Sequence, residues 1–268
     1  MAFIVSIAGS DSSGGAGVQA DLACIKALGH HALSVITAIT AQDIHGVQHV
    51  THIEASSINA QLTAVFSSFS VGAVKSGMLP NKANIQALAE SLQEQPKPLP
   101  YVLDPFMSAS SGERLVQEDT MQLIVDLLFP LATVVTPNIS EAENLTGQNI
   151  TTLEEIISAG NEILKLGCRA VLITCGHADS DPAVDVLLDS RGGDEIPKYM
   201  RGTYFADRSP RGTGCTYASA IACGLATRMS LYDAICNAKR YISAAIANAY
   251  RVESDFWLLN HQVAAREE

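Results

Sequence analysis

The residues best suited to chemistry form a short run near position 212. Gly212-Thr213-Gly214-Cys215-Thr216 precedes a stretch of small residues that is typical of a packed helix. Paired glycines let the backbone approach a ligand closely, and the start of a helix offers unpaired N–H groups and a positive dipole end, which together bind anions. A cysteine in this position is expected to have a lowered pKa. The spacing fits equally well a tight turn that carries a packed, inert thiol.

A second glycine-rich run extends from Gly9 to Gly17, directly after the apolar residues 3–8. It matches neither the P-loop pattern nor the dinucleotide-binding fingerprint. Taken alone, it favours a flexible strand-to-helix turn over a ligand-binding loop.

Polar side chains stand at the ends of several apolar runs. In a parallel sheet covered by helices, ligands bind beyond the carboxyl ends of the strands. We therefore expect one edge of the sheet to gather Asp11, Gln42, Lys75, Asp104, Asn138 and Thr174.

Three short segments allow two interpretations each. Asn138-Ile139-Ser140-Glu141 fits an N-cap with a first-turn acid, or an amide and a carboxylate beside a metal–phosphate group. Asp104, before Pro105, fits a turn residue or a magnesium carboxylate. Ser108 to Gly112 fits a mobile flap or an ordinary exposed loop.

Predicted strands and helices alternate along most of the chain, which indicates a mainly parallel sheet with helices on both faces. We expect a single domain over residues 1–268. Strands are predicted at 3–8, 33–39, 71–74, 101–103, 133–135 and 170–173, with an antiparallel edge pair at 184–188 and 199–205. Helices are predicted at about 16–28, from 56 or 57 toward 66, after Asn81, at 121–128, after 138, at 152–166, from about 214, and at 231–246.

Composition excludes several classes of protein. Of 268 residues, 47% are hydrophobic and 17% are charged, which argues against disorder. A net charge of -11 without a basic block argues against nucleic-acid binding. The cysteines form no C-x-x-C pair and are expected to be reduced. No secretion signal or membrane span is predicted, and the expected location is the cytoplasm.

Taken together, seven blocks in order resemble the hydroxymethylpyrimidine/phosphomethylpyrimidine kinases. The resemblance covers about residues 4–250. The blocks are Ile7-Ala8-Gly9-Ser10-Asp11, Gly14 to Leu22, Val35 to Asp43, Val74 to Leu79, Leu103 to Met107, Thr136 to Glu143 and Gly212 to Thr216.

This resemblance implies a ribokinase-like three-layer sandwich and ATP- and Mg²⁺-dependent phosphorylation of 4-amino-5-hydroxymethyl-2-methylpyrimidine, then of its monophosphate, in thiamine biosynthesis. It also implies a homodimer. Carried over by position, the pyrimidine site comprises Gln42, which faces the amino edge, with Asp21, Gly9 and Met78 around the ring.

By the same resemblance, Asn138 and Glu141 organise magnesium and phosphates, with Asp104 and Thr174 beside them. Gly212, Thr213 and Gly214 form an anion hole. Cys215 stands where related kinases carry an aspartate base.

The chain departs from the family pattern at three places. Thr174-Cys175-Gly176-His177 replaces Lys-Gly-Gly-His, Ser110 replaces a flap lysine, and Val252 to Trp257 replaces a glycine-rich tail. Arg211 stands where the family usually has histidine; it either supplies part of the missing charge to phosphates or is a solvated loop arginine.

Two further functions fit the sequence. Pyridoxal or pyridoxine also presents a hydroxymethyl group to a kinase of this kind. A degenerate pyrimidine-binding protein with weak kinase activity fits the two missing lysines.

Overall fold

A computed structural model describes residues 1–105, 120–175, 184–191, 197–253 and 256–263. Its strands are β1 (Phe3–Asp11), β2 (His31–Asp43), β3 (Gly46–His52), β4 (Val71–Ser76), β5 (Tyr101–Leu103), β6 (Val134–Val135), β7 (Ala170–Ile173), β8 (Val184–Asp189), β9 (Lys198–Arg201), β10 (Tyr250–Glu253) and β11 (Phe256–Leu258). Its helices are α1 (Gly17–Ala27), α2 (Ala55–Ser68), α3 (Lys82–Gln93), α4 (Thr120–Leu127), the 3₁₀ turn η1 (Phe129–Leu131), α5 (Ile139–Thr146), α6 (Leu153–Lys165), α7 (Thr213–Ala226) and α8 (Leu231–Ala247).

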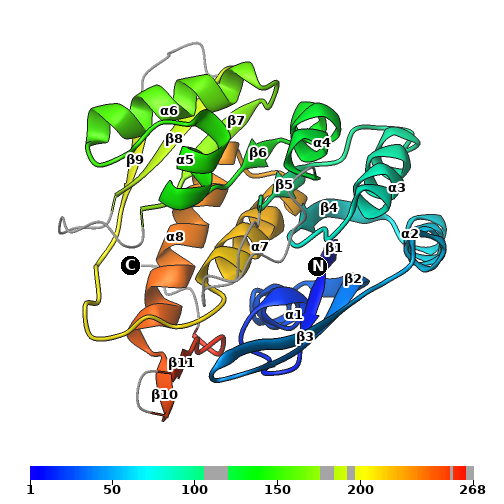
Figure 1. Ribbon diagram of the computed structural model, residues 1–268, viewed down its shortest axis with the longest axis horizontal. Coiled ribbons are helices and arrows are strands. Elements are labelled where there is room, and N and C mark those ends of the chain that lie inside the picture. Colours follow the sequence, from blue (N-terminus) through cyan, green and yellow to red (C-terminus); the bar gives the residue numbers. More distant parts are fainter. Residues whose placement is uncertain (106–119, 176–183, 192–196, 254–255, 264–268) are drawn as a thin grey trace.

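The described strands form one nine-stranded sheet and a separate two-stranded hairpin of β10 and β11. The order across the large sheet is β3-β2-β1-β4-β5-β6-β7-β8-β9. Strands β2 through β7 in this order pair in parallel, whereas β3, β8 and β9 are antiparallel to their neighbours. All carboxyl ends of the parallel strands therefore meet along one edge, as Figure 1 shows.

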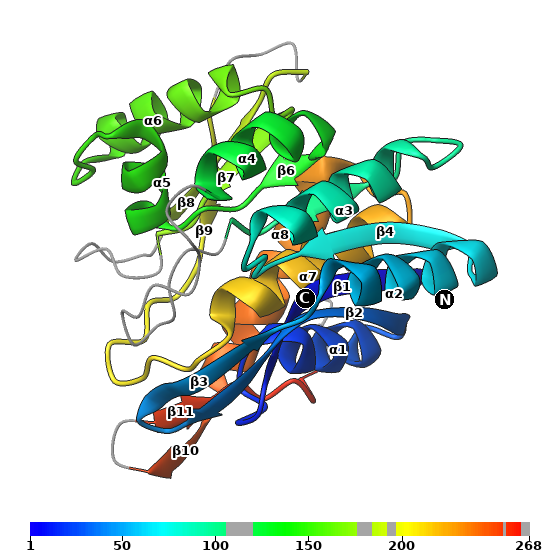
Figure 2. The same ribbon diagram turned by 45° about the vertical axis from the view of Figure 1, so that its right-hand side comes forward.

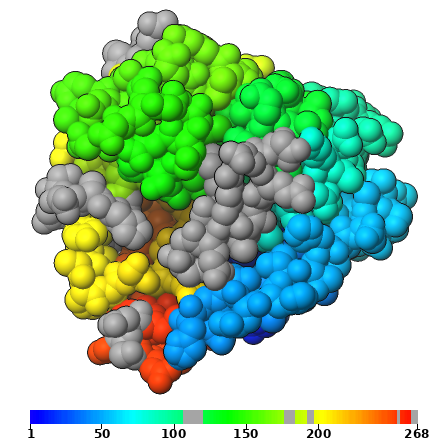
Figure 3. Space-filling view, in the orientation of Figure 1, coloured from blue at the N-terminus to red at the C-terminus, as the bar shows by residue number. Residues whose placement is uncertain are grey.

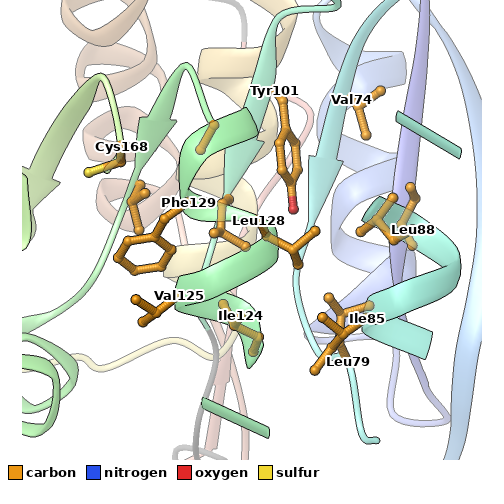
Figure 4. Packing of buried hydrophobic residues seen from close by; sticks show 14 of the residues in the cluster. Val74, Leu79, Ile85, Leu88, Tyr101, Ile124, Val125, Leu128, Phe129 and Cys168 are labelled. Atoms are coloured by element: carbon orange, nitrogen blue, oxygen red, sulfur yellow. The ribbon is translucent and has the colours of Figure 1, made fainter. Parts of the chain in front are cut away.

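Two apolar cores lie on opposite faces of the sheet, because the parallel strands are buried on both sides. Helices α2 to α6 cover one face, where Val74, Tyr101, Leu88, Ile124 and Phe129 pack together (Figure 4). Helices α1, α7 and α8 cover the other face (Figure 2). The predicted α/β three-layer architecture is confirmed. No helix among the described residues is long and apolar enough to cross a membrane.

Small residues bring α7 close to its neighbours in the second core. Ala218, Ala220 and Ala222 are buried there against α1, α8 and the sheet. A Cβ at Gly224 would lie 2.7 Å from the Cβ of Ala234 on α8, so only glycine allows this approach of the two helices.

Several predicted boundaries are corrected. β2 continues to Asp43 and turns into β3, a hairpin that the polar, glycine-containing segment 44–52 did not predict. β9 ends at Arg201 rather than at residue 205. Glu54 is the N-cap of α2 in place of Ser56 or Ser57, and its side chain makes no capping bond.

The capping box at the start of α6 is confirmed and has a pH-dependent consequence. The Glu155 carboxylate accepts hydrogen bonds from the backbone N–H groups of Thr151 and Thr152, and these bonds lower its pKa from 4.5 to about 2. A carboxyl group with a lowered pKa in the folded state stabilises the fold above its ordinary pKa and loses that contribution as the pH falls.

We therefore expect Glu155→Gln to reduce the free energy of unfolding most above about pH 5, with the difference from wild type shrinking between pH 4.5 and 2. Urea unfolding at several pH values measures this difference. Glu154→Gln, which removes an equal charge from the same helix turn, is the control. A Glu155→Gln difference independent of pH would contradict the assignment.

Candidate functional site

The polar residues predicted at strand ends do lie along one edge of the sheet. Asp11 ends β1, and Asp104 directly follows β5. Asn138 and Thr174, which follow β6 and β7, form an isolated parallel bridge with each other. The start of α7 lies beside this edge, because its preceding residue, Arg211, lines the same pocket as Asp11.

One pocket opens at this edge between β1, β2, β4 and α7. Several residues predicted for the site line it, namely Gly9, Gln42, Met78, Arg211 and Cys215. The rest of its wall comes from Ala8, Ser10, Asp11, Ala16, Gly17, Thr40, Lys75 and Gly77. The other predicted residues lie outside this wall. Asp104, Asn138, Glu141 and Thr174 follow strands β5 to β7, and Gly212, Thr213 and Gly214 form the start of α7.

Glycines at two points make the pocket possible. Gly17 has a φ of +57°, and a Cβ there would lie 2.3 Å from the carbonyl oxygen of Gly9. Gly212 has a φ of +78°, and a Cβ there would lie 2.1 Å from the carbonyl oxygen of Gly15. The two glycine-rich runs, far apart in the sequence, are therefore packed backbone against backbone.

The first glycine-rich loop is held in place by Asp11. Its carboxylate accepts hydrogen bonds from the backbone N–H groups of Ser13 (2.8 Å) and Ala16 (2.9 Å). Ala16 and Gly17 line the pocket. The run is the strand-to-helix turn that was predicted, between β1 and α1, and its anchored residues also form part of the pocket wall.

The start of α7 has the geometry expected of an anion site. Gly212 is the N-cap in the left-handed conformation, and its carbonyl accepts the N–H of Thr216 at 2.9 Å. The first backbone N–H groups of a helix have no partner within the helix. A Cβ at Gly214 would meet no atom of the described residues within 4 Å, so these residues leave space in front of this turn. A phosphate group fits such a cradle.

A buried ion pair lies directly beneath the pocket. The Lys75 Nζ atom is 3.0 Å from the nearer carboxylate oxygen of Asp21 and 3.7 Å from Asp104. Asp21 also accepts hydrogen bonds from the hydroxyl groups of Ser6 (2.5 Å) and Ser219 (2.8 Å). Asp21, predicted beside the ring, is fully buried one layer below the pocket wall and anchors Lys75 instead. The sequence placed Lys75 among the polar residues expected at this edge of the sheet, but it did not predict the pairing of Lys75 with Asp21.

The charges of this cluster depend on each other. Burial by itself would lower the pKa of Lys75, but the negative charge nearby, above all that of Asp21, raises it overall, so Lys75 is a cation. Burial raises the pKa of Asp104, and the Lys75 ammonium opposes that rise. The positive charge at the base of the pocket is thereby fixed and largely neutralised.

The expected lowering of the Cys215 pKa is wrong. Burial raises the pKa of this thiol to about 12, and the charge of Lys75 offsets only part of that rise. The dipole of a helix N-terminus therefore does not prevail over the loss of solvation. Cys215 is a protonated thiol at neutral pH.

Asn138 and Glu141 form the capping box of α5. The Asn138 side chain accepts the Glu141 N–H, and the Glu141 carboxylate accepts the Asn138 N–H, each at 2.9 Å. The described residues contain no group of three His, Cys, Asp or Glu side chains able to hold a metal. Mg²⁺ in phosphate-transfer sites is usually held by one or two carboxylates together with substrate phosphates, so the oxygen donors of Asp104 and Glu141 fit that ion.

Gln42 and Met78 give the pocket one polar and one apolar wall. The Gln42 backbone is tied to the Ser12 hydroxyl at 2.7 Å, whereas its carboxamide has no hydrogen-bond partner among the described residues. Met78 is buried, and its sulfur would lie 3.0 Å from a Cβ at Gly9. The pocket wall therefore offers both hydrogen-bonding and apolar contacts to a ligand.

Arg211 is not a solvated loop arginine. Its guanidinium donates to the carbonyl oxygens of Asp43 (3.2 Å) and Ile44 (3.4 Å) and lies 4.8 Å from the centre of the Phe256 ring. The backbone N–H of Arg211 donates to the Trp257 carbonyl at 3.2 Å. The replaced C-terminal tail thus forms a hairpin against Arg211. Figure 3 shows this hairpin, in red, beside the blue surface of β2 and β3.

The predicted flap Ser108 to Gly112, with Ser110, lies outside the described residues, as does His177. Whether the flap closes over the pocket stays a prediction.

Known proteins resemble this chain over most of its length. The family model described as "Phosphomethylpyrimidine kinase" matches residues 11–260. A hydroxymethylpyrimidine/phosphomethylpyrimidine kinase of Rhizobium meliloti (strain 1021) is 44% identical over 94% of this chain and 93% of its own. The solved structure of phosphomethylpyrimidine kinase from Clostridium difficile 630 is 39% identical with a TM-score of 0.79, covering 92% of this chain and 100% of that one. An ADP complex of Bacillus subtilis pyridoxal kinase is 33% identical with a TM-score of 0.87, covering 97% of both chains.

The buried ion pair generates a stability prediction. Asp21→Asn removes the main counter-charge of a fully buried lysine, and breaking such a pair costs about 3–5 kcal/mol. Ser6→Ala removes only one hydrogen bond to the same carboxylate, which costs about 1–3 kcal/mol in a buried site. Urea unfolding compares the two variants. A loss in Asp21→Asn no greater than that in Ser6→Ala would contradict the central role of the pair.

The two glycines of the anion site should respond differently to a methyl group. Gly212→Ala places a Cβ 2.1 Å from the Gly15 carbonyl and should reduce stability. Gly214→Ala places its methyl group in open space where a phosphate would lie. We expect near-normal melting of Gly214→Ala but a raised KM for the phosphate-bearing ligand. Thermal melting and steady-state kinetics measure this; equal melting of the two variants would show that the loop packing is loose.

Proposed function

The chain belongs to the phosphomethylpyrimidine kinase family, and we propose that it phosphorylates 4-amino-5-hydroxymethyl-2-methylpyrimidine and then the monophosphate in thiamine biosynthesis, using ATP. The observation that carries the proposal is that one pocket is lined both by a residue suited to ring recognition and by a residue of the anion site. Gln42, whose carboxamide has no hydrogen-bond partner in the described part of the chain, and Cys215, in the first turn of α7, line the same cavity. A ring held at Gln42 would therefore face the anion site.

Recognition of the ring would rest on Gln42, Met78 and Gly9. A carboxamide donates and accepts, so it can pair with both an amino group and a ring nitrogen of a pyrimidine edge. Met78 offers a polarisable apolar surface, and the absence of a side chain at Gly9 lets the Met78 sulfur pack close to the Gly9 backbone in the pocket wall.

Phosphoryl transfer would rest on positioning and charge rather than on a covalent intermediate. The unpaired N–H groups at Gly212 to Gly214 would face the oxygens of the transferring group, where negative charge develops. The charge of Lys75 is largely matched by Asp21 and Asp104, so the positive potential in front of the transferring group would come mainly from the N–H groups of α7.

Mg²⁺ would be held through Asp104 and Glu141, with Asn138 and Thr174 beside them on the adjacent strand ends. When bound, the ion neutralises phosphate charge. The chain's own contribution is the fixed backbone of the α5 capping box, which presents Glu141 in one conformation.

Cys215 would donate a hydrogen bond from its Sγ–H group to the oxygen of the substrate hydroxyl. Its raised pKa means that the thiol is already protonated before substrate binds, so it would not take the hydroxyl proton. That proton would leave late, after bond formation to phosphorus has begun, and would pass to an oxygen of the transferred phosphoryl group, which suits a loose transition state that demands little help from a base.

Pyridoxal phosphorylation is the second candidate. The observation that favours it is the extensive likeness to the structure described as Bacillus subtilis pyridoxal kinase. The pyridoxal ring lacks the amino group that Gln42 would pair with, so the pocket supports the pyrimidine better.

Three further parts of the proposal come from the family resemblance. They are a single ribokinase-like domain over residues 1–268, a homodimer, and a location in the cytoplasm. The overall acidity of the chain, with a net charge of -11, agrees with a small-molecule enzyme rather than a nucleic-acid-binding one.

An ATP- and Mg²⁺-dependent assay with the pyrimidine alcohol, its monophosphate and pyridoxal tests the proposal. We expect both pyrimidines to be phosphorylated faster than pyridoxal. Cys215→Ala removes a hydrogen bond to the reacting hydroxyl and should lower kcat by about tenfold, which corresponds to about 1.4 kcal/mol. Cys236→Ala removes a partly exposed thiol outside the pocket and is the control.

Each alternative has its own outcome. Faster turnover of pyridoxal would favour the second candidate, and tight pyrimidine binding without turnover would favour a degenerate binding protein. Near-normal kcat in Cys215→Ala would make this thiol a packing residue.

A further inference from the structure

Arg211 joins three segments around the mouth of the pocket. Its backbone directly precedes the anion site, its guanidinium holds the turn between β2 and β3, and its side chain lies against Phe256 of the C-terminal hairpin. It also lines the pocket itself. The Arg211 side chain therefore lies where it could contact a group attached to the substrate ring.

Arg211 differs from the other cation of the pocket wall in how its charge is used. Lys75 is paired with two carboxylates. Among the residues the structure describes, Arg211 has no carboxylate within ion-pair distance, and its guanidinium bonds go to neutral carbonyl oxygens. Those bonds, at 3.2 and 3.4 Å, lie at or beyond the long end of the usual range.

The two substrates of the proposed function differ by a phosphate group, which carries close to two negative charges at neutral pH. A guanidinium binds phosphate through two parallel, charge-assisted hydrogen bonds, which are about twice as strong as bonds between neutral groups. When the phosphorylated substrate is present, Arg211 can give up its two long hydrogen bonds to carbonyl oxygens and form two stronger hydrogen bonds to the phosphate. Without that phosphate, the exchange is unfavourable.

We propose that Arg211 binds the phosphate of the monophosphate substrate and thereby sets the preference between the two phosphorylation steps. This inference rests on the proposed function. In the second step, a substrate phosphate oxygen forms the new bond to the γ-phosphorus of ATP. The bond from that phosphorus to the β–γ bridging oxygen breaks, and ADP leaves with the electron pair. The attacking oxygen is already ionised, so this step needs a cation that orients it rather than a base.

A comparison of kcat/KM for the alcohol and the monophosphate in Arg211→Gln tests the inference. We expect the ratio of monophosphate to alcohol to fall at least tenfold. Arg211→Lys keeps the charge but loses the two-pronged geometry, so its ratio should fall at least threefold. Arg208→Gln is the matched control, since Arg208 bonds to Asp207 and Ala247 and is not in the pocket wall. Its ratio should equal that of wild type.

The other outcomes overturn the inference. An equal loss with both substrates would assign Arg211 to the γ-phosphate of ATP, which both steps share. An unchanged ratio in a folded Arg211→Gln or Arg211→Lys protein would leave Arg211 only the role of holding the β2–β3 turn.

Calorimetry with the monophosphate separates this inference from the proposed function. Binding that weakens at least tenfold in Arg211→Gln would support phosphate recognition even if wild type transfers no phosphoryl group. Equal binding by wild type and variant would overturn it, whatever the kinase assay shows. Arg211→Lys serves for the same titration if Arg211→Gln does not fold.

Discussion

The site depends on a lysine that is buried without access to water. A buried ammonium is tolerated only when opposite charge and hydrogen bonds replace its hydration. Asp21 supplies both to Lys75, and the hydroxyl groups of Ser6 and Ser219 satisfy the remaining oxygen positions. Because these groups come from β1, β4, α1 and α7, one electrostatic requirement fixes the relative positions of the elements that build the pocket.

That arrangement also gives different roles to Lys75 and to the positive groups at the pocket mouth. The charge of Lys75 is matched by two carboxylates of the protein, so its ammonium group stays paired with them and does not move to a ligand. Under the proposed function, phosphate groups would be bound by the backbone N–H groups of α7 and by the weakly bonded Arg211 at the pocket mouth. The two positions where relatives usually carry lysine hold Thr174 and Ser110 here. The anion site therefore relies more on oriented dipoles than a lysine-rich site does.

Much of the fold and part of the candidate site were predictable from the sequence. The features that were not predicted were missed for physical reasons. The alternating strands, the Asn138–Glu141 and Thr152–Glu155 capping boxes and the anchoring glycine positions are encoded locally, in short spacings. The β2–β3 hairpin was missed because its second strand is largely exposed and polar. The burial of Asp21 and the raised pKa of Cys215 were missed because they depend on residues far away in the chain that exclude water. Sequence and geometry lead to the same expectation of which pocket residue binds which group of the substrate. The experiments proposed above test that expectation.

The contact between Asp21 and Ser219 also carries a consequence for how the enzyme is made. These residues are 198 positions apart, and the glycine-to-glycine packing of the pocket spans a similar separation. During synthesis, the N-terminal strands leave the ribosome long before α7 exists. Until then Lys75 and Asp21 lack the helix that shields them, and no phosphate cradle can form. The phosphate cradle can therefore form only after α7 has been synthesised, and until then the N-terminal part of the nascent chain lacks the stabilisation that a ligand bound there would give.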